Sequence, residues 1–235
     1  MSAFDDLSFS FQHFDGNVRL FPLPNLVLFP YVMQPLHIFE PRYRDLLEDA
    51  LAGDQLITMA VLAPGWERNY EGRPAIHPMA CLGRITAHTR LEDGTYNVLL
   101  LGLRRVRILH ELAPVRRFRE ATVELCEDVY AAHQASHRDS LQRALRRGLL
   151  DLLPMLPEAG EQLDQLLGDD VPLGMLSDVI SYLLDISLAK KQLLLDELDV
   201  QRRAELLLAH LSVATAGAEA ADAEPLCFPP AFSMN

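Results

Sequence analysis

Short apolar runs separated by prolines dominate the first part of the chain. Residues 19–40 read RLFPLPNLVLFPYVMQPLHIFE, with prolines at positions 22, 24, 30 and 35. An interior proline removes a helical N–H and clashes with the preceding turn, so this spacing argues against a helix. Prolines are tolerated at strand starts, edges and bulges. The pattern therefore predicts a kinked, buried β segment that opens a barrel or a small sheet.

A helical period follows this segment. Pro41 suits the first position of a helix, where a missing N–H costs nothing, and Gly53 suits its end. The apolar residues Tyr43, Leu46, Leu47, Ala50 and Leu51 then recur at helical spacing. The opposite face carries Arg42, Arg44, Asp45, Glu48 and Asp49. We expect one short amphipathic helix whose charged face is solvated.

The next apolar run, residues 55–63, has the length of a strand. It leads into a loop, residues 64–78, that is rich in proline, glycine and charge. This loop holds the only tryptophan of the chain, Trp66, and also Tyr70. Long loops often carry function, so these two aromatic residues are candidates for a contact surface. The alternative is that Trp66 plugs the end of a barrel.

Residues 79–125 show the clearest β pattern in the chain. Asp93-Gly94 stands between two apolar runs, and glycine supplies the positive φ that a tight hairpin turn needs. Further alternating runs occupy residues 103–112 and 118–127. With the opening segment, we predict about six to eight short strands with one inserted helix. Sheets of many short, sequentially adjacent strands usually close or curl into a barrel.

Near Glu127 the hydrophobic period changes from two to 3.6, which predicts a C-terminal helical bundle. We expect a first helix over residues 129–153, ended by prolines, and a short one over 158–167. Three more are expected: one beginning at Pro172, one over 187–198, and one over 200–211. Asp199 is the predicted N-cap of the last helix.

The predicted fold class is α+β, with four parts along the chain. An N-terminal arm covers residues 1–16 and forms either an edge strand or a contact with a partner. A β-barrel domain covers residues 17–126 and a helical bundle covers 127–212. Residues 213–235 form a flexible tail, because the composition there loses its period. A sharper alternative is that Phe228 and Phe232 dock in a groove of this molecule or of a neighbour.

Charge and cysteine content narrow the function classes. The formal net charge of −12 disfavours nucleic acid, since phosphates would meet a negative field. The strongest local exception is the basic run around Arg105 and Arg107, which would share one face of a strand. The three cysteines are isolated, which is typical of unpaired thiols in a reducing compartment. The sequence shows no signal peptide and no apolar run long enough to span a membrane, so we expect a cytoplasmic protein.

The sequence supports no catalytic chemistry. It contains neither a GxxxxGK[ST] loop, nor a GxSxG elbow, nor an HExxH motif. His133 and His137 lie four residues apart on a predicted helix, but no third ligand accompanies them, so solvated histidines are favoured over a metal site. We therefore predict no catalytic residue, no cofactor and no metal.

Three blocks in the right order resemble a known family, the Lon N-terminal (substrate-binding) domain. They are LFPLPNLVLFPYVMQPLHIFEPRYRDLLEDAL, GRITAHTRLEDGTYNVLLLGLRRVRI and LSDVISYLLDISLAKKQLLLDELDVQRRAELLLAHL, which span most of residues 17–212. The resemblance implies a PUA-like β-barrel followed by a helical bundle. One departure is the sequence Tyr31-Val32-Met33, which stands where the family commonly has a small glycine after Phe-Pro.

In full-length Lon proteases of the peptidase S16 family, this domain precedes an AAA+ ATPase and a Ser-Lys protease domain and helps to recognise substrates. This chain ends after the bundle, so the resemblance implies a stand-alone, non-enzymatic domain. The leading hypothesis is that it binds polypeptide segments or a protein partner as an adaptor.

The candidate polypeptide contacts are Pro30, Tyr31, Trp66 and Tyr70. The alternatives are an RNA-binding PUA-like module and an uncharacterised enzyme. The sequence leaves the oligomeric state open.

Overall fold

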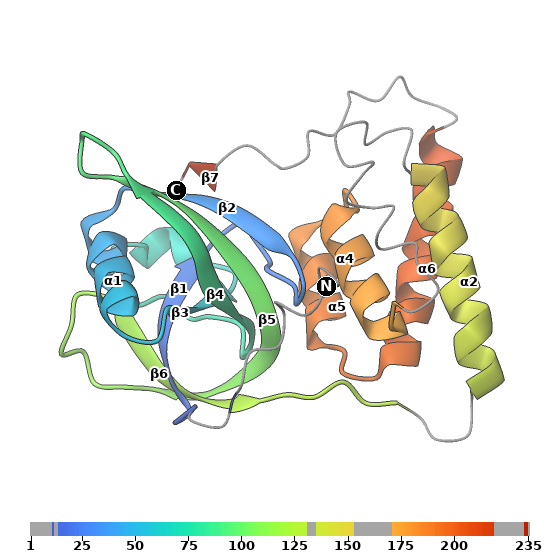
Figure 1. Ribbon diagram of the computed structural model, residues 1–235, viewed down its shortest axis with the longest axis horizontal. Helices are drawn as coiled ribbons and strands as arrows, with labels where there is room; N and C mark the ends of the chain where they lie inside the picture. The colour runs from blue at the N-terminus through green and yellow to red at the C-terminus, as the bar shows by residue number, and fades with distance from the viewer. Residues whose placement is uncertain (1–10, 12–13, 131–134, 153–170, 219–232, 235) are drawn as a thin grey trace. The chain divides into compact units, whose positions relative to one another are not determined.

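The computed structural model describes residues 11, 14–130, 135–152, 171–218 and 233–234. The chain divides into two compact units, which are described separately (Figure 1). The first unit comprises Met1–Cys126 with Phe232–Asn235, and the second comprises Glu127–Ala231. The first is built on a sheet and the second on helices, as expected for an α+β fold.

The sheet of the first unit closes on itself. Its strands are β1 (Asn17–Leu23), β2 (Met33–Ile38), β3 (Leu56–Val61), β4 (Met79–Arg90), β5 (Tyr96–Glu111), β6 (Arg119–Leu125) and β7 (Ser233–Met234). Their order is β4-β3-β1-β6-β5-β2-β7, and β4 also pairs with β5. Strands β4, β3, β1, β6 and β5 therefore form a closed ring, and Figure 1 shows β4 and β5 as its long curved arrows.

Strand β5 carries more partners than any other because it is 16 residues long. One of its edges pairs with β4, while the other pairs first with β2 and then with β6. The sequence shows this stretch as two consecutive apolar runs, which the structure joins into one strand. Glycine at position 102 allows β5 to pass close to the preceding turn. Any other residue would clash there, because its Cβ would lie 2.0 Å from the Phe29 carbonyl oxygen.

Proline positions in the sheet follow from its hydrogen-bonding edges. Pro22 lies in β1 beyond the residues that pair with β6, so its missing N–H leaves the β1–β6 ladder intact. Pro35 lies in β2, which pairs with β5 on one edge and with only the two residues of β7 on the other. Both prolines thus occur where the sheet tolerates them, as the opening pattern predicted.

Alternating residues of the closed strands fill the interior of the ring. The core includes Val18, Leu20, Leu82, Val106 and Val123, all at most 5% exposed. Phe11 and Phe14, whose ring centroids are 6.2 Å apart, pack against this core. The rest of the predicted N-terminal arm lies outside the described residues.

Helix α1 (Pro41–Ala52) lies against β1 and β3. Its predicted apolar stripe is buried, and the Tyr43 hydroxyl donates a hydrogen bond to the Pro22 carbonyl oxygen at 2.9 Å. The expectation of a solvated charged face was wrong in part. Asp49 accepts a hydrogen bond from Arg19 at 2.6 Å, and Glu48 accepts one from Tyr96 at 2.9 Å. These carboxylates tie the helix to the sheet.

The second unit contains four helices among its described residues: α2 (Ala135–Leu152), α4 (Leu173–Leu183), α5 (Leu188–Asp196) and α6 (Val200–Ala218). The first begins later than predicted because Val129 forms a bridge with Asp199 instead of a helical turn. Asp199 is the N-cap that we predicted, since its side chain accepts hydrogen bonds from the backbone N–H groups of Gln201 and Arg202. The helix predicted over residues 158–167 lies outside the described residues.

A buried arginine connects the elements of this unit. Arg203 is fully buried, donates to the Glu197 carbonyl oxygen at 2.7 Å and pairs with Asp128 at 2.8 Å. Its Nε also lies 3.4 Å from Asp178 Oδ1, and Asp178 is itself fully buried. Such a network is satisfied only in one arrangement of the helices.

Two parts of the predicted tail have regular structure. Helix α6 continues to Ala218, and the alanines at its end, good helix formers, explain why the loss of apolar period did not end it. Ser233 and Met234 form β7, which runs parallel to β2. Phe228 and Phe232, the predicted docking residues, lie outside the described residues.

Candidate functional site

The loop after β3 places the two predicted aromatic residues together. Trp66 begins a 3₁₀ turn, Trp66–Asn69, and Tyr70 follows directly. Their ring centroids are 5.6 Å apart in an edge-on arrangement. Both side chains are half-buried, so neither is wholly a core residue.

Tyr70 connects this loop to the start of α1. Its hydroxyl donates to Glu40 Oε1 at 2.7 Å, and the same carboxylate accepts from Arg42 Nε at 2.9 Å. The Arg42 guanidinium lies 4.7 Å from the ring centroids of both Tyr43 and Tyr70, between two aromatic faces. Cation–π contacts of this kind hold an arginine in one position.

The protonation states in this cluster are set by burial. Burial raises the pKa of Tyr70 above its ordinary value, and its hydrogen bond to Glu40 raises it further. Burial also raises the pKa of Tyr43 strongly. Both phenols are therefore protonated at neutral pH and act as hydrogen-bond donors.

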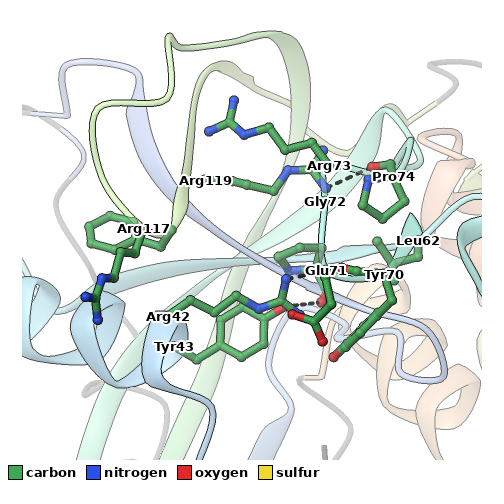
Figure 2. A pocket seen from close by; sticks show the side chains of 12 residues that line it. Arg42, Tyr43, Leu62, Tyr70, Glu71, Gly72, Arg73, Pro74, Arg117 and Arg119 are labelled. Carbon is green, nitrogen blue, oxygen red and sulfur yellow. Dashed lines mark hydrogen bonds between the residues drawn. The ribbon is translucent and has the colours of Figure 1, made fainter.

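A pocket opens beside these residues (Figure 2). We call it the Tyr70 pocket; its lining is Pro22, Arg42, Tyr43, Leu62, Tyr70, Glu71, Gly72, Arg73, Pro74, Arg117, Phe118 and Arg119. The space that water could fill is about 70 Å³. One water occupies about 30 Å³ in the liquid, and small-molecule sites measure roughly 300 Å³ or more. The pocket therefore fits a single small side chain better than a cofactor.

The four arginines of the pocket have two different roles. Arg119 is buried, pairs with Glu111 and donates to the Pro74 carbonyl oxygen at 2.9 Å, so it builds the wall. Arg42 is held by Glu40 in the same way. Arg73 and Arg117 form the rim, and their nearest carboxylates, Glu111 and Asp45, are 3.7 and 3.8 Å away. The side chain of Arg117 is 75% exposed, so its charge faces solvent.

Pro30 and Tyr31, the other predicted contacts, lie in a separate turn between β1 and β2. Pro30 is buried, whereas Tyr31 is 39% exposed. Two backbone hydrogen bonds to Gly102 of β5 hold this turn. The Tyr31 N–H donates to the Gly102 carbonyl oxygen at 2.7 Å, and the Gly102 N–H donates to the Val32 carbonyl oxygen at 2.8 Å. Tyr31 has a φ of +66°, which is the left-handed conformation that favours glycine. The unusual tyrosine therefore occupies a position suited to the family's glycine.

The basic run on β5, the local exception to the negative net charge, is exposed only in part. Arg105 is buried, at 2% exposure, and only Arg107 of the pair is exposed. A phosphate backbone cannot reach Arg105.

The described residues contain no cluster of three or more histidine, cysteine, aspartate or glutamate side chains placed to hold a metal ion. His137 lies 2.8 Å from Glu205, and His133 is outside the described residues. Within the same part of the chain, no helix has the length and apolar character required to cross a bilayer.

Sequence reasoning found Tyr70 but missed most of the pocket around it. The sequence pattern places Arg42 on the solvated face of a helix and does not indicate that Arg119 is buried. The available signal was the order Glu40-Pro41-Arg42-Tyr43, which puts an acid, a base and an aromatic residue at one helix start. These residues indicate a site only together with Tyr70, which the loop places against Glu40 and Arg42.

Comparison with known proteins agrees with this architecture. The family model described as the "ATP-dependent protease La (LON) substrate-binding domain" matches residues 17–213. The chain therefore belongs to the family of Lon substrate-binding domains. The matched model describes the substrate-binding part of Lon and not its ATPase or protease domains.

The chain is also similar in sequence to Lon proteases over most of its length. The chain is 26% identical to Lon protease 2 of Myxococcus xanthus over 80% of its own length, and 29% identical to the Lon protease of Paraburkholderia phytofirmans over 83%. It spans only 22% and 24% of those two proteins.

Among structures, the N-terminal domain of a Mycobacterium avium complex Lon protease matches with a TM-score of 0.67 at 18% identity, covering 83% of this chain and 98% of that one. A Lon N-terminal domain protein from Xanthomonas campestris matches with a TM-score of 0.56 at 25% identity, covering 82% and 97%.

Proposed function

We propose that this chain is a non-catalytic module that binds polypeptide segments, and that the Tyr70 pocket takes one side chain of the bound segment. The observation that carries the proposal is the size and lining of this pocket in a member of a substrate-binding family. Its lining includes the apolar side chains of Leu62 and Phe118 and the exposed arginines Arg73 and Arg117. A small apolar or acidic side chain meets both requirements.

The rim arginines would act on the charge of the segment. Arg117 is the more available of the two, because its nearest carboxylate is 3.8 Å away, whereas Arg73 also donates a hydrogen bond to the Leu112 carbonyl oxygen at 3.2 Å. Arg117 can therefore approach a carboxylate or a backbone carbonyl of the ligand without losing a strong partner. Arginine at such a position offers several donors in a planar fork. The surrounding net charge of −12 disfavours strongly acidic chains, so the preferred segment would carry an isolated acid rather than an acidic run.

A fluorescence anisotropy titration with labelled, unfolded peptides tests this function. We expect dissociation constants in the micromolar range for peptides that combine apolar residues with one acid. Tyr70→Ala removes one wall of the pocket and should weaken binding roughly tenfold or more, the range of a buried aromatic anchor. If no peptide binds more tightly than about millimolar, the proposed function is wrong.

A matched pair of charge variants separates the rim from general electrostatics. Arg117→Gln and Arg107→Gln both remove one exposed arginine, but only Arg117 lines the pocket. We expect Arg117→Gln to weaken binding of acid-containing peptides and Arg107→Gln to leave it unchanged. Equal effects would mean that the pocket does not select the ligand. An RNA titration of the same proteins is the counter-test for the RNA alternative, which no observation here favours.

We further infer an adaptor role in the cytoplasm, in which a protein partner takes over the bound segment. The buried thiols of Cys81 and Cys126 support a reducing compartment. Alkylation of freshly lysed cells followed by mass spectrometry should find both thiols reduced. For the adaptor role, the peptide-loaded protein should bind its partner more tightly than the Tyr70→Ala variant mixed with the same peptide. Equal partner binding would leave simple peptide holding as the function.

A further inference from the structure

The outer edge of β2 differs from the rest of the closed sheet. Strand β2 pairs with β5 along its whole length, from Met33 opposite Leu101 to Ile38 opposite Tyr96. On its other edge, the described residues provide only Ser233 and Met234, which pair in parallel with Leu36 and His37. We call this second side, over residues 33–39, the β2 edge. It is the place where the sheet ends.

Large apolar side chains are exposed along this segment. Tyr31, Met33 and Phe39 are 39%, 38% and 40% exposed, although β7 is in place. The His37 and Phe39 rings lie 6.1 Å apart in a stacked arrangement. Because alternate residues of a strand share a face, Met33, His37 and Phe39 form an apolar and aromatic strip, which the buried Pro35 interrupts. Exposed apolar surface next to an open strand edge is typical of an interaction site.

The ligand that fits an open strand edge is an extended polypeptide. Backbone N–H and C=O groups of the edge, apart from the N–H that Pro35 lacks, pair with those of an added strand, which gives affinity with little dependence on sequence. Side chains at alternate positions of the added strand then meet the exposed strip, which selects apolar residues. Ser233 and Met234 demonstrate that this edge accepts an extended backbone in parallel orientation.

We propose that the β2 edge is a strand-addition site for extended, apolar polypeptide segments, and that the chain's own Ser233–Met234 occupies it as an internal competitor. The inference rests on polypeptide binding as the proposed function and adds a second surface, distinct from the Tyr70 pocket. A tethered segment competes at an effective concentration near millimolar. A pairing of two residues is short enough for a longer external segment to displace it.

The test uses the full-length chain and a variant with Ser233→Pro and Met234→Pro. Proline lacks the N–H that a ladder needs, so this variant keeps the tail but cannot form β7. The probes are a fluorescein-labelled peptide of residues 225–235, with Cys227 replaced by serine, and a labelled unfolded apolar peptide. We expect both peptides to bind the proline variant roughly tenfold more tightly than the unaltered chain. A change of this size in the dissociation constant corresponds to about one net hydrogen bond.

Edge variants identify the surface. In the proline variant, Met33→Asp or Phe39→Asp should abolish the gain in affinity, because each places a charge in the apolar strip. Leu109→Asp is the matched control, since Leu109 is 55% exposed on β5 and away from the β2 edge. Unchanged affinity in the proline variant, or an equal loss with Leu109→Asp, would overturn the inference.

The two proposals can fail separately. If Tyr70→Ala weakens peptide binding while the proline and edge variants have no effect, the proposed function stands and strand addition is wrong. If the tail peptide binds at the β2 edge but the Tyr70 variant is unaffected, the opposite holds. If neither probe binds any form of the protein, both are wrong.

Discussion

Tyr31 offers a direct measurement of how much backbone strain this protein accepts at an exposed turn. Its φ of +66° costs about 1–2 kcal/mol for a residue with a Cβ. The two hydrogen bonds to Gly102, at 2.7 and 2.8 Å, hold the turn in this conformation whatever residue is present. Tyr31→Ala and Tyr31→Gly both remove the ring, but only glycine also removes the strain.

The difference between the two variants isolates the strain. Glycine gains about 1–2 kcal/mol from relief and loses about 0.4–1 kcal/mol because its unfolded chain is more flexible. We therefore expect Tyr31→Gly to be more stable than Tyr31→Ala by about 0.5–1 kcal/mol, or roughly 1–4 °C in Tm for a chain of this size. Fluorescence of Trp66, the only tryptophan, reports the unfolding of the first unit.

A functional measurement completes this experiment. If the Tyr31 ring contacts polypeptide, both variants should weaken peptide binding to the same extent, although their stabilities differ. The backbone strain at Tyr31 would then be explained by a functional contact of its exposed ring with the bound polypeptide. A Tyr31→Ala variant as stable as Tyr31→Gly would refute the argument from φ. Unchanged peptide affinity in both would remove Tyr31 from the contact surface.

Three further predictions concern the fold. Arg203→Met should destabilise the second unit by about 3–5 kcal/mol in urea unfolding, because it removes the guanidinium that lies beside the fully buried Asp178; adding Asp178→Asn should restore part of the loss, and strictly additive effects would show that the pair is not coupled. Gly102→Ala should cost about 1–3 kcal/mol or more, since its Cβ would clash with the Phe29 carbonyl, and a neutral effect would mean that the turn yields easily. Asp199→Ala should cost about 1 kcal/mol through loss of the N-cap, measured by thermal unfolding of helical circular dichroism, whereas Asp199→Asn should be nearly neutral.

Much of the fold could be predicted because its local signals agree with its tertiary structure. Asp93-Gly94 marked the β4–β5 hairpin, and Gly94 has the positive φ that such a turn requires. Pro41 and Asp199 marked helix starts through their backbone chemistry. The continuous strand β5 was missed because it depends on Gly102 fitting against a turn about seventy residues earlier, a contact that no local pattern contains.

The candidate site was harder to predict for a related reason. Hydrophobic patterning treats charged residues as solvated, so it gave no hint that Arg42 lies between two tyrosines or that Arg119 is buried. Both environments are created by the loop that carries Tyr70 and Pro74, and its path is not periodic. Aromatic residues on a polar loop were the signal that led to Tyr70.

The closed ring of strands has a consequence for how the first unit forms. Its final pairing joins β1 to β6, and the side chains of Asn17 and Thr122 meet across 105 positions of sequence. Long-range closure of this kind slows folding, because the entropy of the intervening chain is lost before the contacts form. During synthesis, β1 must therefore wait until β6 has emerged from the ribosome. A fragment that ends before Arg119 would leave unpaired the edges of β1 and of the second half of β5 that β6 covers, and would tend to aggregate rather than fold.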